Sequence, residues 1–470
     1  MTLTPVQQSA YNDIRAKLDA SGMFNTVTHD EVNDVAARLK GLSSTDADAV
    51  IDEMAANGQL DRLAEETVDG SWFGNGGLSG SERTDLFNTL ATKLDGTSLA
   101  SVSNAFAGAT TGEDDFNVVT DLASAVATHA TSQAKVDYVG ALASETDGKG
   151  LQGAGLGGGW ERNVDSEAGA IGTVLGSMRG YYAEQAFGKL TTDQTRAVLK
   201  TGIDQSVNFS SNSVSTSFDT ARFQGVMAAA SSIYNPDMKA RIFDAGTDAL
   251  RIVRDDTKFP VISVGEKDTL KAMTASMAGL LDSDTSGVVR ELTYNTETQD
   301  GSDLAAYSQV MIATGQEAKL GEQMAKLQLG NDLSGDPIAR LNETVSVGGQ
   351  ERRENAGALG YFTGAVYAGA AANSKDVAAQ REMVTNVLNS VLTVVDKASP
   401  KGVATAASLG KVWMSSAVKA AISDPGLDPA ARLERAALPQ DPATGELGVG
   451  DAVADAFNTT LSRVQRTAVP

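Results

Sequence analysis

The chain has 470 residues, with 38 Lys and Arg against 60 Asp and Glu, which gives a net charge of −22. It contains no cysteine and only two histidines, which excludes disulfide scaffolds, cysteine-based zinc sites, iron–sulfur clusters and thiol nucleophiles, and leaves too few ligands for a histidine-rich metal centre. Because phosphate contacts need clustered Lys and Arg, this charge argues against nucleic acid as the main partner, and it also disfavours anionic membrane surfaces.

Hydrophobic residues make up 41% of the chain, which is enough for a sizeable core. Most of them are Ala, Val and Leu, and this composition suits closely packed helices. At roughly 150 residues per domain, the length indicates two to four domains or one elongated array. The start of the chain, Met1–Asn12, is polar and lacks the basic and apolar stretches of a secretory signal. We therefore expect a cytoplasmic protein, or one secreted by a bacterial system that does not depend on a signal peptide.

Helix starts are marked by capping boxes, in which each of two side chains accepts a hydrogen bond from the backbone N–H of the other residue. Three such pairs precede apolar residues at helical spacing: Thr28 with Glu31, Ser79 with Glu82, and Thr191 with Gln194. The first predicted helix, before all of these, carries Tyr11, Ile14 and Leu18 on one face. A long apolar stripe from Val377 to Val395 predicts a late helix that ends before Pro400.

Strands are rare in this pattern. Asn208–Ser217 is a polar, Ser-rich segment with no expected strand, and Phe259–Val264 is the only short β-like run. We predict an all-α fold, a multi-helix array.

Some of the predicted helices recur in a repeated order. Leu122–Leu142 and Val226–Gly246 both read as an Ala-rich helix, a polar turn and a second helix, and a looser third copy runs over Tyr361–Val395. Glu167–Gly180 and Glu266–Gly279 continue the first two copies in register. We expect tandem helical-hairpin repeats of about 100 residues near 78–180, 181–280 and 355–400, which would stack on their neighbours. The alternative is that amphipathic helices in an Ala-rich chain resemble one another by chance.

Composition divides the chain into three predicted parts. Residues 1–70 form an acidic helical unit, with thirteen Asp and Glu against five Lys and Arg. Residues 71–425 form the main helical array. Residues 426–470 form a loop-rich tail with one short helix around Val453–Val464.

One segment resembles the first half of a calcium-binding loop. Asp282 and Asp284 alternate before Gly287, as carboxylates do around this hard cation. The second half departs from the pattern, because the twelfth position is Thr293 where a bidentate Glu is needed. Asp before a helix is also an ordinary N-cap, and we favour that interpretation.

A glycine pattern at Gly148, Gly150 and Gly153 matches a dinucleotide-binding fingerprint as a string of letters. No hydrophobic strand precedes it and no amphipathic helix begins at its last glycine. We therefore predict a surface loop.

No residues are assigned a catalytic, cofactor-binding or metal-binding role. We interpret both histidines as solvated or capping, two of the three tryptophans as pinning loops, and the acidic pairs as chance neighbours among 60 carboxylates, although such pairs can flank a glycosidic bond. The residues in question are His29, His129, Trp72, Trp160, Glu65 with Glu66, Glu291 with Glu297, and Asp255 with Asp256.

The segment Asn355–Ser374 is uncharged and contains the small-residue spacing Gly360-x-x-x-Gly364. This length and spacing suit a membrane helix that packs closely against another. Because its residues are mostly Ala and Gly, with little gain on transfer into lipid, we favour a helix buried inside a bundle.

Three stretches resemble the long helical region of proteobacterial secreted effectors and polymorphic toxins. They are LSGSERTDLFNTLATKL (Leu78–Leu94), LLDSDTSGVVREL (Leu280–Leu292) and NAGALGYFTGAV (Asn355–Val366). The resemblance implies a region that serves delivery or presents a C-terminal toxin domain. Fewer than fifty residues follow Ile422, too few for an ordinary catalytic toxin domain.

We therefore expect a non-catalytic helical binding or delivery protein, a secreted or injected effector or its delivery region. The expected partner is a protein, either of the secretion apparatus or of the target. The alternatives are a membrane-active helical toxin, an enzyme that uses carboxylates alone, and a structural subunit of a phage or injection particle.

Overall fold

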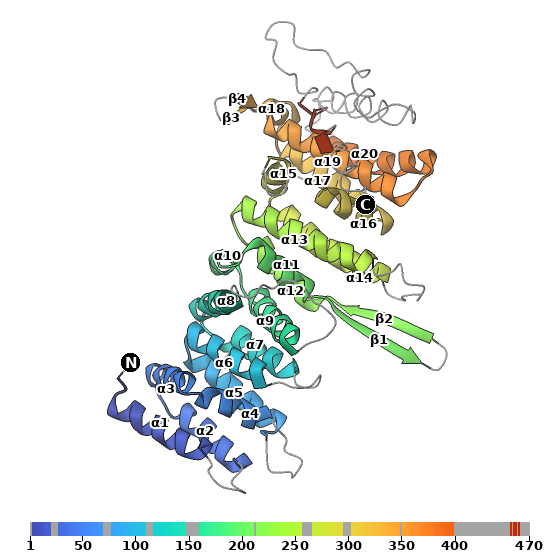
Figure 1. Ribbon diagram of the computed structural model, residues 1–470. Coiled ribbons are helices and arrows are strands. Elements are labelled where there is room, and N and C mark those ends of the chain that lie inside the picture. Colours follow the sequence, from blue (N-terminus) through green and yellow to red (C-terminus); the bar gives the residue numbers. More distant parts are fainter. Residues whose placement is uncertain are drawn as a thin grey trace. The chain divides into compact units, whose positions relative to one another are not determined.

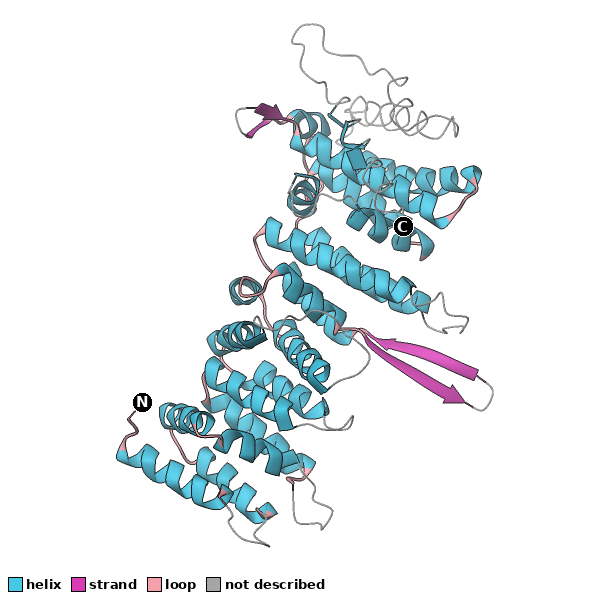
Figure 2. Cartoon of the chain, viewed as in Figure 1, coloured by secondary structure: helices cyan, strands magenta, loops and turns pink. Residues whose placement is uncertain are grey.

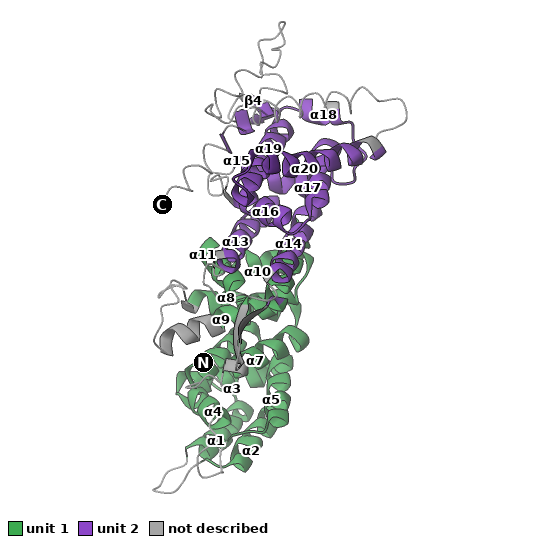
Figure 3. Ribbon diagram, turned by 90° about the vertical axis from the view of Figure 1, so that its right-hand side faces the viewer, with its two compact units in different colours: residues 1–204, 221–234 green, residues 205–220, 235–470 purple. Residues whose placement is uncertain are grey.

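The structure is a computed structural model that describes residues 2–19, 27–68, 77–109, 116–146, 159–210, 213–255, 266–294, 302–347 and 350–398, and most of 452–460. Helices dominate it, with two short pairs of strands (Figures 1 and 2), so the all-α prediction is confirmed. The chain divides into two compact units (Figure 3). Unit 1 comprises residues 1–204 and 221–234, and unit 2 comprises residues 205–220 and 235–470.

Unit 1 is a two-row stack of helices. In one row α4, α6, α8 and α10 follow one another in contact, and in the other α5, α7, α9 and α12 do so. Most of these helices thus pack on the helix two positions along the chain, as in helical repeat arrays, whereas α9 packs on α12, three positions along. The helices are α1 (Pro5–Leu18), α2 (His29–Lys40), α3 (Ser44–Ala56), α4 (Gln59–Val68), α5 (Gly80–Lys93), α6 (Gly96–Ala109), α7 (Phe116–His129), α8 (Ser132–Thr146), α9 (Gly159–Gly176), α10 (Gly180–Phe187), α11 (Thr192–Lys200) and α12 (Ala221–Ser231).

The N-terminal helices are continuous with this stack. α2 packs on α5, and both α3 and α4 pack on α6. The predicted acidic unit of residues 1–70 therefore shares its contacts with helices beyond residue 70, and the division into compact units places no boundary there.

All three predicted capping boxes are present. At the start of α5, the Ser79 backbone N–H donates to Glu82 Oε2 at 2.9 Å and the Glu82 N–H donates to Ser79 Oγ at 3.4 Å. The boxes at Thr28 and Thr191 have the same reciprocal bonds and begin α2 and α11. Local sequence therefore determines where these helices start.

Glycines allow the closest approaches between stacked helices. A Cβ on Gly96, at the start of α6, would lie 2.3 Å from the backbone oxygen of Ala134 in α8. Gly176 of α9 and Gly225 of α12 face each other, and a Cβ on either would lie 3.3–3.4 Å from the other's backbone. Larger side chains would force these helices apart.

Unit 2 stacks its helices with a different period. α13, α16 and α19 form one row and α14, α17 and α20 the other, so each helix packs on the third helix along. Its helices are α13 (Pro236–Asp255), α14 (Glu266–Ser283), α15 (Thr285–Tyr294), α16 (Ser302–Ala313), α17 (Glu317–Leu329), α18 (Pro337–Asn342), α19 (Glu354–Asn373) and α20 (Val377–Ala398).

The segments predicted to repeat do form helix–turn–helix elements, but their packing differs. α19 packs directly on α20, whereas α7 packs on α5 and α9 and α8 packs on α6 and α10. In the middle copy, α12 belongs to unit 1 and α13 to unit 2. The three copies thus share an element order without a shared contact pattern.

α19 contains almost all of the uncharged segment Asn355–Ser374, which the structure buries inside unit 2 as expected. The helix is buried over most of its length, and it contacts α15, α16, α17, α18 and α20. None of the helices in the described ranges is both long enough and apolar enough to cross a membrane.

The strands correct one prediction. β1 (Asp204–Ser210) pairs with β2 (Ser213–Asp219) across the segment expected to lack strands. The apolar residues there are separated by even numbers of positions, Val207 from Phe209 and Val214 from Phe218. This is the period-two pattern of a strand, which the high Ser content obscures. β3 (Val345–Val347) and β4 (Gln350–Arg352) pair antiparallel, with Val345 opposite Arg352. The β-like run Phe259–Val264 lies outside the described residues.

Candidate functional site

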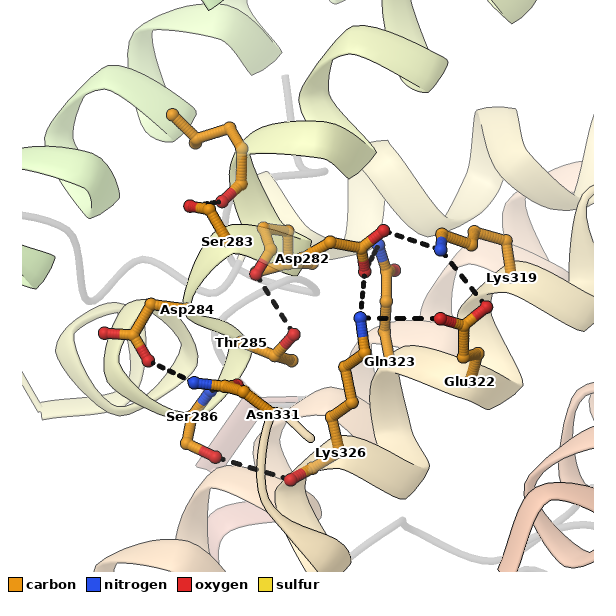
Figure 4. A network of polar contacts seen from close by, with 12 residues as sticks. Asp282, Ser283, Asp284, Thr285, Ser286, Lys319, Glu322, Gln323, Lys326 and Asn331 are labelled. Carbon is orange, nitrogen blue, oxygen red and sulfur yellow. Dashed lines mark hydrogen bonds and ion pairs between the residues drawn. The ribbon is translucent and has the colours of Figure 1, made fainter. Parts of the chain in front are cut away.

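The two candidate calcium ligands lie at the junction of α14 and α15 (Figure 4). Asp284 is the N-cap of α15, because its Oδ1 accepts a hydrogen bond from the Gly287 backbone N–H at 3.1 Å. The same oxygen accepts from Asn331 Nδ2 at 2.9 Å. The favoured interpretation of Asp284 as a helix cap is confirmed.

Asp282 faces α17 instead (Figure 4). Its carboxylate lies 2.6 Å from Lys319 Nζ and 3.1 Å from Lys326 Nζ, and accepts a hydrogen bond from Gln323 Nε2 at 3.3 Å. The Asp282 carboxylate is thus neutralised by two lysines. The Asp284 carboxylate is bonded instead to the Gly287 N–H and the Asn331 side chain. In the described part of the chain, no three His, Asp or Glu residues gather where they could hold a metal ion.

The lysines are held by a second carboxylate as well. Glu322 lies 3.1 Å from Lys319 Nζ and 3.4 Å from Lys326 Nζ. Burial acts to lower the pKa of Lys319, but its bonds with Asp282 and Glu322 outweigh burial and raise it. This network joins the end of α14 to α17 through mutually satisfied charges, so we interpret it as a structural connection.

His29 has a partner that its sequence position did not reveal. Its Nε2 lies 2.9 Å from Oε2 of Glu82, which is 53 residues away in the first turn of α5. Asn33 Nδ2 donates to the other Glu82 oxygen at 3.0 Å. The prediction that His29 is only solvated or capping is therefore incomplete, because its side chain also joins α2 to α5. His129 is exposed at the last residue of α7.

The acidic pairs do not form a catalytic arrangement in the described residues. Glu65 and Glu66 both pair with Arg62, at 3.4 and 2.6 Å. Burial raises the pKa of Glu291, but its predicted partner Glu297 lies outside the described residues. The structure also leaves undescribed Asp256, Trp72, the loop glycines Gly148, Gly150 and Gly153, and the side chains of Asp255 and Trp160.

A depression of about 560 Å³ lies between α1 and α2. Two ion pairs lie along it, one between Lys17 and Asp34 and one between Arg38 and Asp13 at 3.3 Å. Because its charged groups bind each other, this depression offers no charged group prepared for a ligand.

The feature that sequence analysis missed is a cluster of exposed tyrosines in unit 1, which we call the tyrosine cluster. Tyr181, Tyr182 and Tyr234 are 62%, 40% and 77% exposed. The rings of Tyr181 and Tyr182 meet edge to face, with centroids 5.5 Å apart. Large side chains in a fold of this kind are mostly buried, so three exposed tyrosines on neighbouring segments indicate a contact surface.

Two segments distant in sequence build the tyrosine cluster. The Gly180 backbone N–H donates to Ser232 Oγ at 2.8 Å, and the Tyr234 N–H donates to Glu184 Oε2 at 2.7 Å. These bonds hold the chain after α12 against the first turns of α10. Gly180 has a φ of +59°, a conformation that favours glycine, and it lets α10 begin directly at the tyrosines.

Comparison with known proteins provides no relative for this chain. The sequence matches no protein-family model, and no significant similarity to a curated protein or a solved structure was found.

Proposed function

We propose that this chain is a helical binding protein that holds a protein partner at the tyrosine cluster, as a bacterial secreted effector or its delivery region. The observation that carries the proposal is the exposure of Tyr181, Tyr182 and Tyr234 on bonded neighbouring segments. Tyrosine is enriched in protein interfaces, because it buries a large rigid ring and keeps a polar hydroxyl for hydrogen bonding.

The surroundings of the cluster support binding over chemistry. Glu184, the carboxylate next to the tyrosines, accepts a hydrogen bond from the Tyr234 backbone, and Arg179 donates to the Gly176 and Met178 carbonyls at 2.7 and 2.6 Å. These charged groups hold the local backbone. The exposed aromatic rings remain as the groups that a partner meets first.

Charge indicates what kind of partner surface fits unit 1. Residues 1–150 contain 23 Asp and Glu against 9 Lys and Arg, a net charge of −14 out of −22 for the whole chain. A partner with a basic contact surface would be attracted to this unit at long range, and its association would slow as salt is added.

Site-specific photocrosslinking tests the proposal. A benzoylphenylalanine at Tyr182 should yield one defined adduct in lysates of the source organism or of its target cells. The matched control is the same residue at Val6, an exposed position of α1 (58% exposed) remote in sequence from the cluster. The Tyr181→Ala/Tyr234→Ala background should abolish the adduct without changing helicity.

The outcome of this experiment separates the candidate functions. An adduct that forms equally from Val6, or that survives both alanine substitutions, would contradict binding at the tyrosine cluster. Leakage of anionic vesicles caused by the purified chain would instead favour a membrane-active toxin. Ordered self-assembly in electron micrographs would favour a structural subunit of a phage or injection particle.

A further inference from the structure

The glycine face of α19 is occupied by a segment from the far end of the chain. Residues 452–453, 455–457 and 459–460 are helical, and they contact α19 within unit 2. Fifty-three residues, 399–451, separate this segment from α20 in sequence. We call residues 452–460 the C-terminal segment.

Two glycines of α19 make this contact possible. A Cβ on Gly360 would lie 2.2 Å from the backbone oxygen of Val453, closer than atoms can approach. A Cβ on Gly364 would lie 3.1 Å from the backbone oxygen of Phe457 and 3.0 Å from Cβ of Thr460. Together the two glycines form a shallow groove into which the backbone of a second helix fits.

The C-terminal segment presents a matching apolar face to this groove. Val453, Phe457 and Thr460 recur at i, i+4 and i+7 and are 2%, 2% and 0% exposed, the spacing of helix-in-groove recognition. The Phe457 ring lies 6.1 Å from that of Tyr367 in α19. Asp455, between the first two anchors, is exposed. The segment therefore uses one face for docking and leaves the other to solvent.

We propose that the Gly360–Gly364 groove is a receptor site for a short amphipathic helix, which the chain's own C-terminal segment fills as a releasable latch. A helix of this length is marginal in water on its own, so its helical form depends on docking. The ligand class is a helix with apolar residues at i and i+4, as Val453 and Phe457 are, and a small residue at i+7. This proposal stands independently of the tyrosine cluster.

A peptide supplied in trans tests the receptor site. The probe is a fluorescent peptide of residues 449–464, titrated into three full-length chains: wild type, Phe457→Asp, and Phe457→Asp/Gly360→Leu. Phe457→Asp should free the groove and bind the peptide. The wild type should bind it at least about tenfold more weakly, because the tethered segment competes at high effective concentration. The double variant, with the groove filled by leucine, should not bind.

The same experiment can overturn the proposal. Failure of Phe457→Asp to bind the peptide while its helicity and melting curve match wild type, or equal binding by all three chains, would show that the groove is no receptor. A peptide that carries Phe457→Asp is the matched probe and should not bind any of the chains.

A second measurement remains decisive if Phe457→Asp unfolds unit 2. Alanine forms helices better than glycine, so Gly360→Ala would stabilise α19 if the groove were empty. With the C-terminal segment docked, it should release the segment and increase hydrogen exchange in residues 452–460, while α17 stays protected. Gly108→Ala in α6 is the control, since nothing lies within 4 Å of a Cβ there. Unchanged exchange at 452–460 in Gly360→Ala would overturn the latch.

Discussion

Arg251 of α13 and Asp303 of α16 form an ion pair of 3.0 Å in which the Asp303 side chain is only 1% exposed. Thr247 Oγ1 also donates to the same carboxylate at 3.1 Å. A carboxylate removed from water in this way needs charged and hydrogen-bonding partners, and here they come from the neighbouring helix of the same row. The pair therefore fixes how α13 and α16 meet.

Asp303→Ala should destabilise unit 2 by about 3 kcal/mol, because it leaves the Arg251 guanidinium and the Thr247 hydroxyl without this buried acceptor. Urea unfolding followed by circular dichroism measures the loss. The matched control is Asp248→Ala, which removes the other carboxylate on Arg251, at 2.6 Å with its side chain 37% exposed. That exposed pair should contribute at most about 1 kcal/mol. Equal losses in the two variants would contradict the buried role of Asp303.

The pairing of His29 with Glu82 predicts a pH dependence for the contact between α2 and α5. Hydrogen bonds from Ser79 and His29 lower the pKa of Glu82 to about 2, and the bond to Glu82 raises the pKa of His29 above 6.5. The Glu82 contribution to stability is present above pH 4.5 and is lost as pH falls towards 2. The His29 contribution is present below pH 6.5 and is lost as pH rises through the raised pKa. The pair should therefore stabilise most between these limits.

Titration of the His29 ring by NMR tests whether Glu82 raises the pKa of His29. The pKa of His29 should be lower in Glu82→Gln than in wild type, because glutamine cannot stabilise the charged imidazole. His129→Gln simplifies assignment, since the chain has only two histidines. An unchanged His29 pKa in Glu82→Gln would show that the pair does not persist in solution.

Local rules predicted much of the helical framework. The capping boxes at Thr28, Ser79 and Thr191 correctly placed the starts of α2, α5 and α11, because both partners lie within one helical turn. The stripe from Val377 to Val395 likewise predicted α20. Asp284 as an N-cap belongs to the same class of short-range signal.

Local sequence patterns do not predict contacts between residues that are distant in the sequence. Glu184 meets Tyr234 from 50 residues away, and His29 meets Glu82 from 53. Neither pair has a sequence signature, because each depends on how stacked helices bring their ends together. The pairing of β1 with β2 is hard to predict for a different reason, because the polar, Ser-rich composition of this segment masks the period-two spacing of its apolar residues.

Asp284 allows a test that separates helix capping from calcium binding. Asp284→Ala should destabilise unit 2 by about 1 kcal/mol through loss of the N-cap, whereas Asp284→Asn should cost only a few tenths, since asparagine caps helices equally well. Addition of 1 mM CaCl₂ should leave the melting temperature of the wild type unchanged. A calcium-dependent rise in melting temperature that both variants abolish would contradict the cap interpretation and support a metal site.

A buried hydroxyl pair in unit 1 gives the last prediction. Tyr138 of α8 and Ser103 of α6 are each 0% exposed, and their hydroxyl oxygens lie 2.8 Å apart. Burial raises the pKa of Tyr138, so its hydroxyl stays protonated and able to donate. Tyr138→Phe should cost about 1–2 kcal/mol, because it leaves the Ser103 hydroxyl buried without this partner.

A double-mutant cycle on this pair distinguishes the hydrogen bond from simple packing. Ser103→Ala removes the hydroxyl that Tyr138→Phe leaves unsatisfied, so the double variant should be more stable than the sum of the single losses predicts. We expect a coupling energy of about 1 kcal/mol, measured by urea unfolding of the four chains. Strict additivity would mean that the two hydroxyls do not bond, and that α6 and α8 are held together by their other contacts, such as the close approach at Gly96.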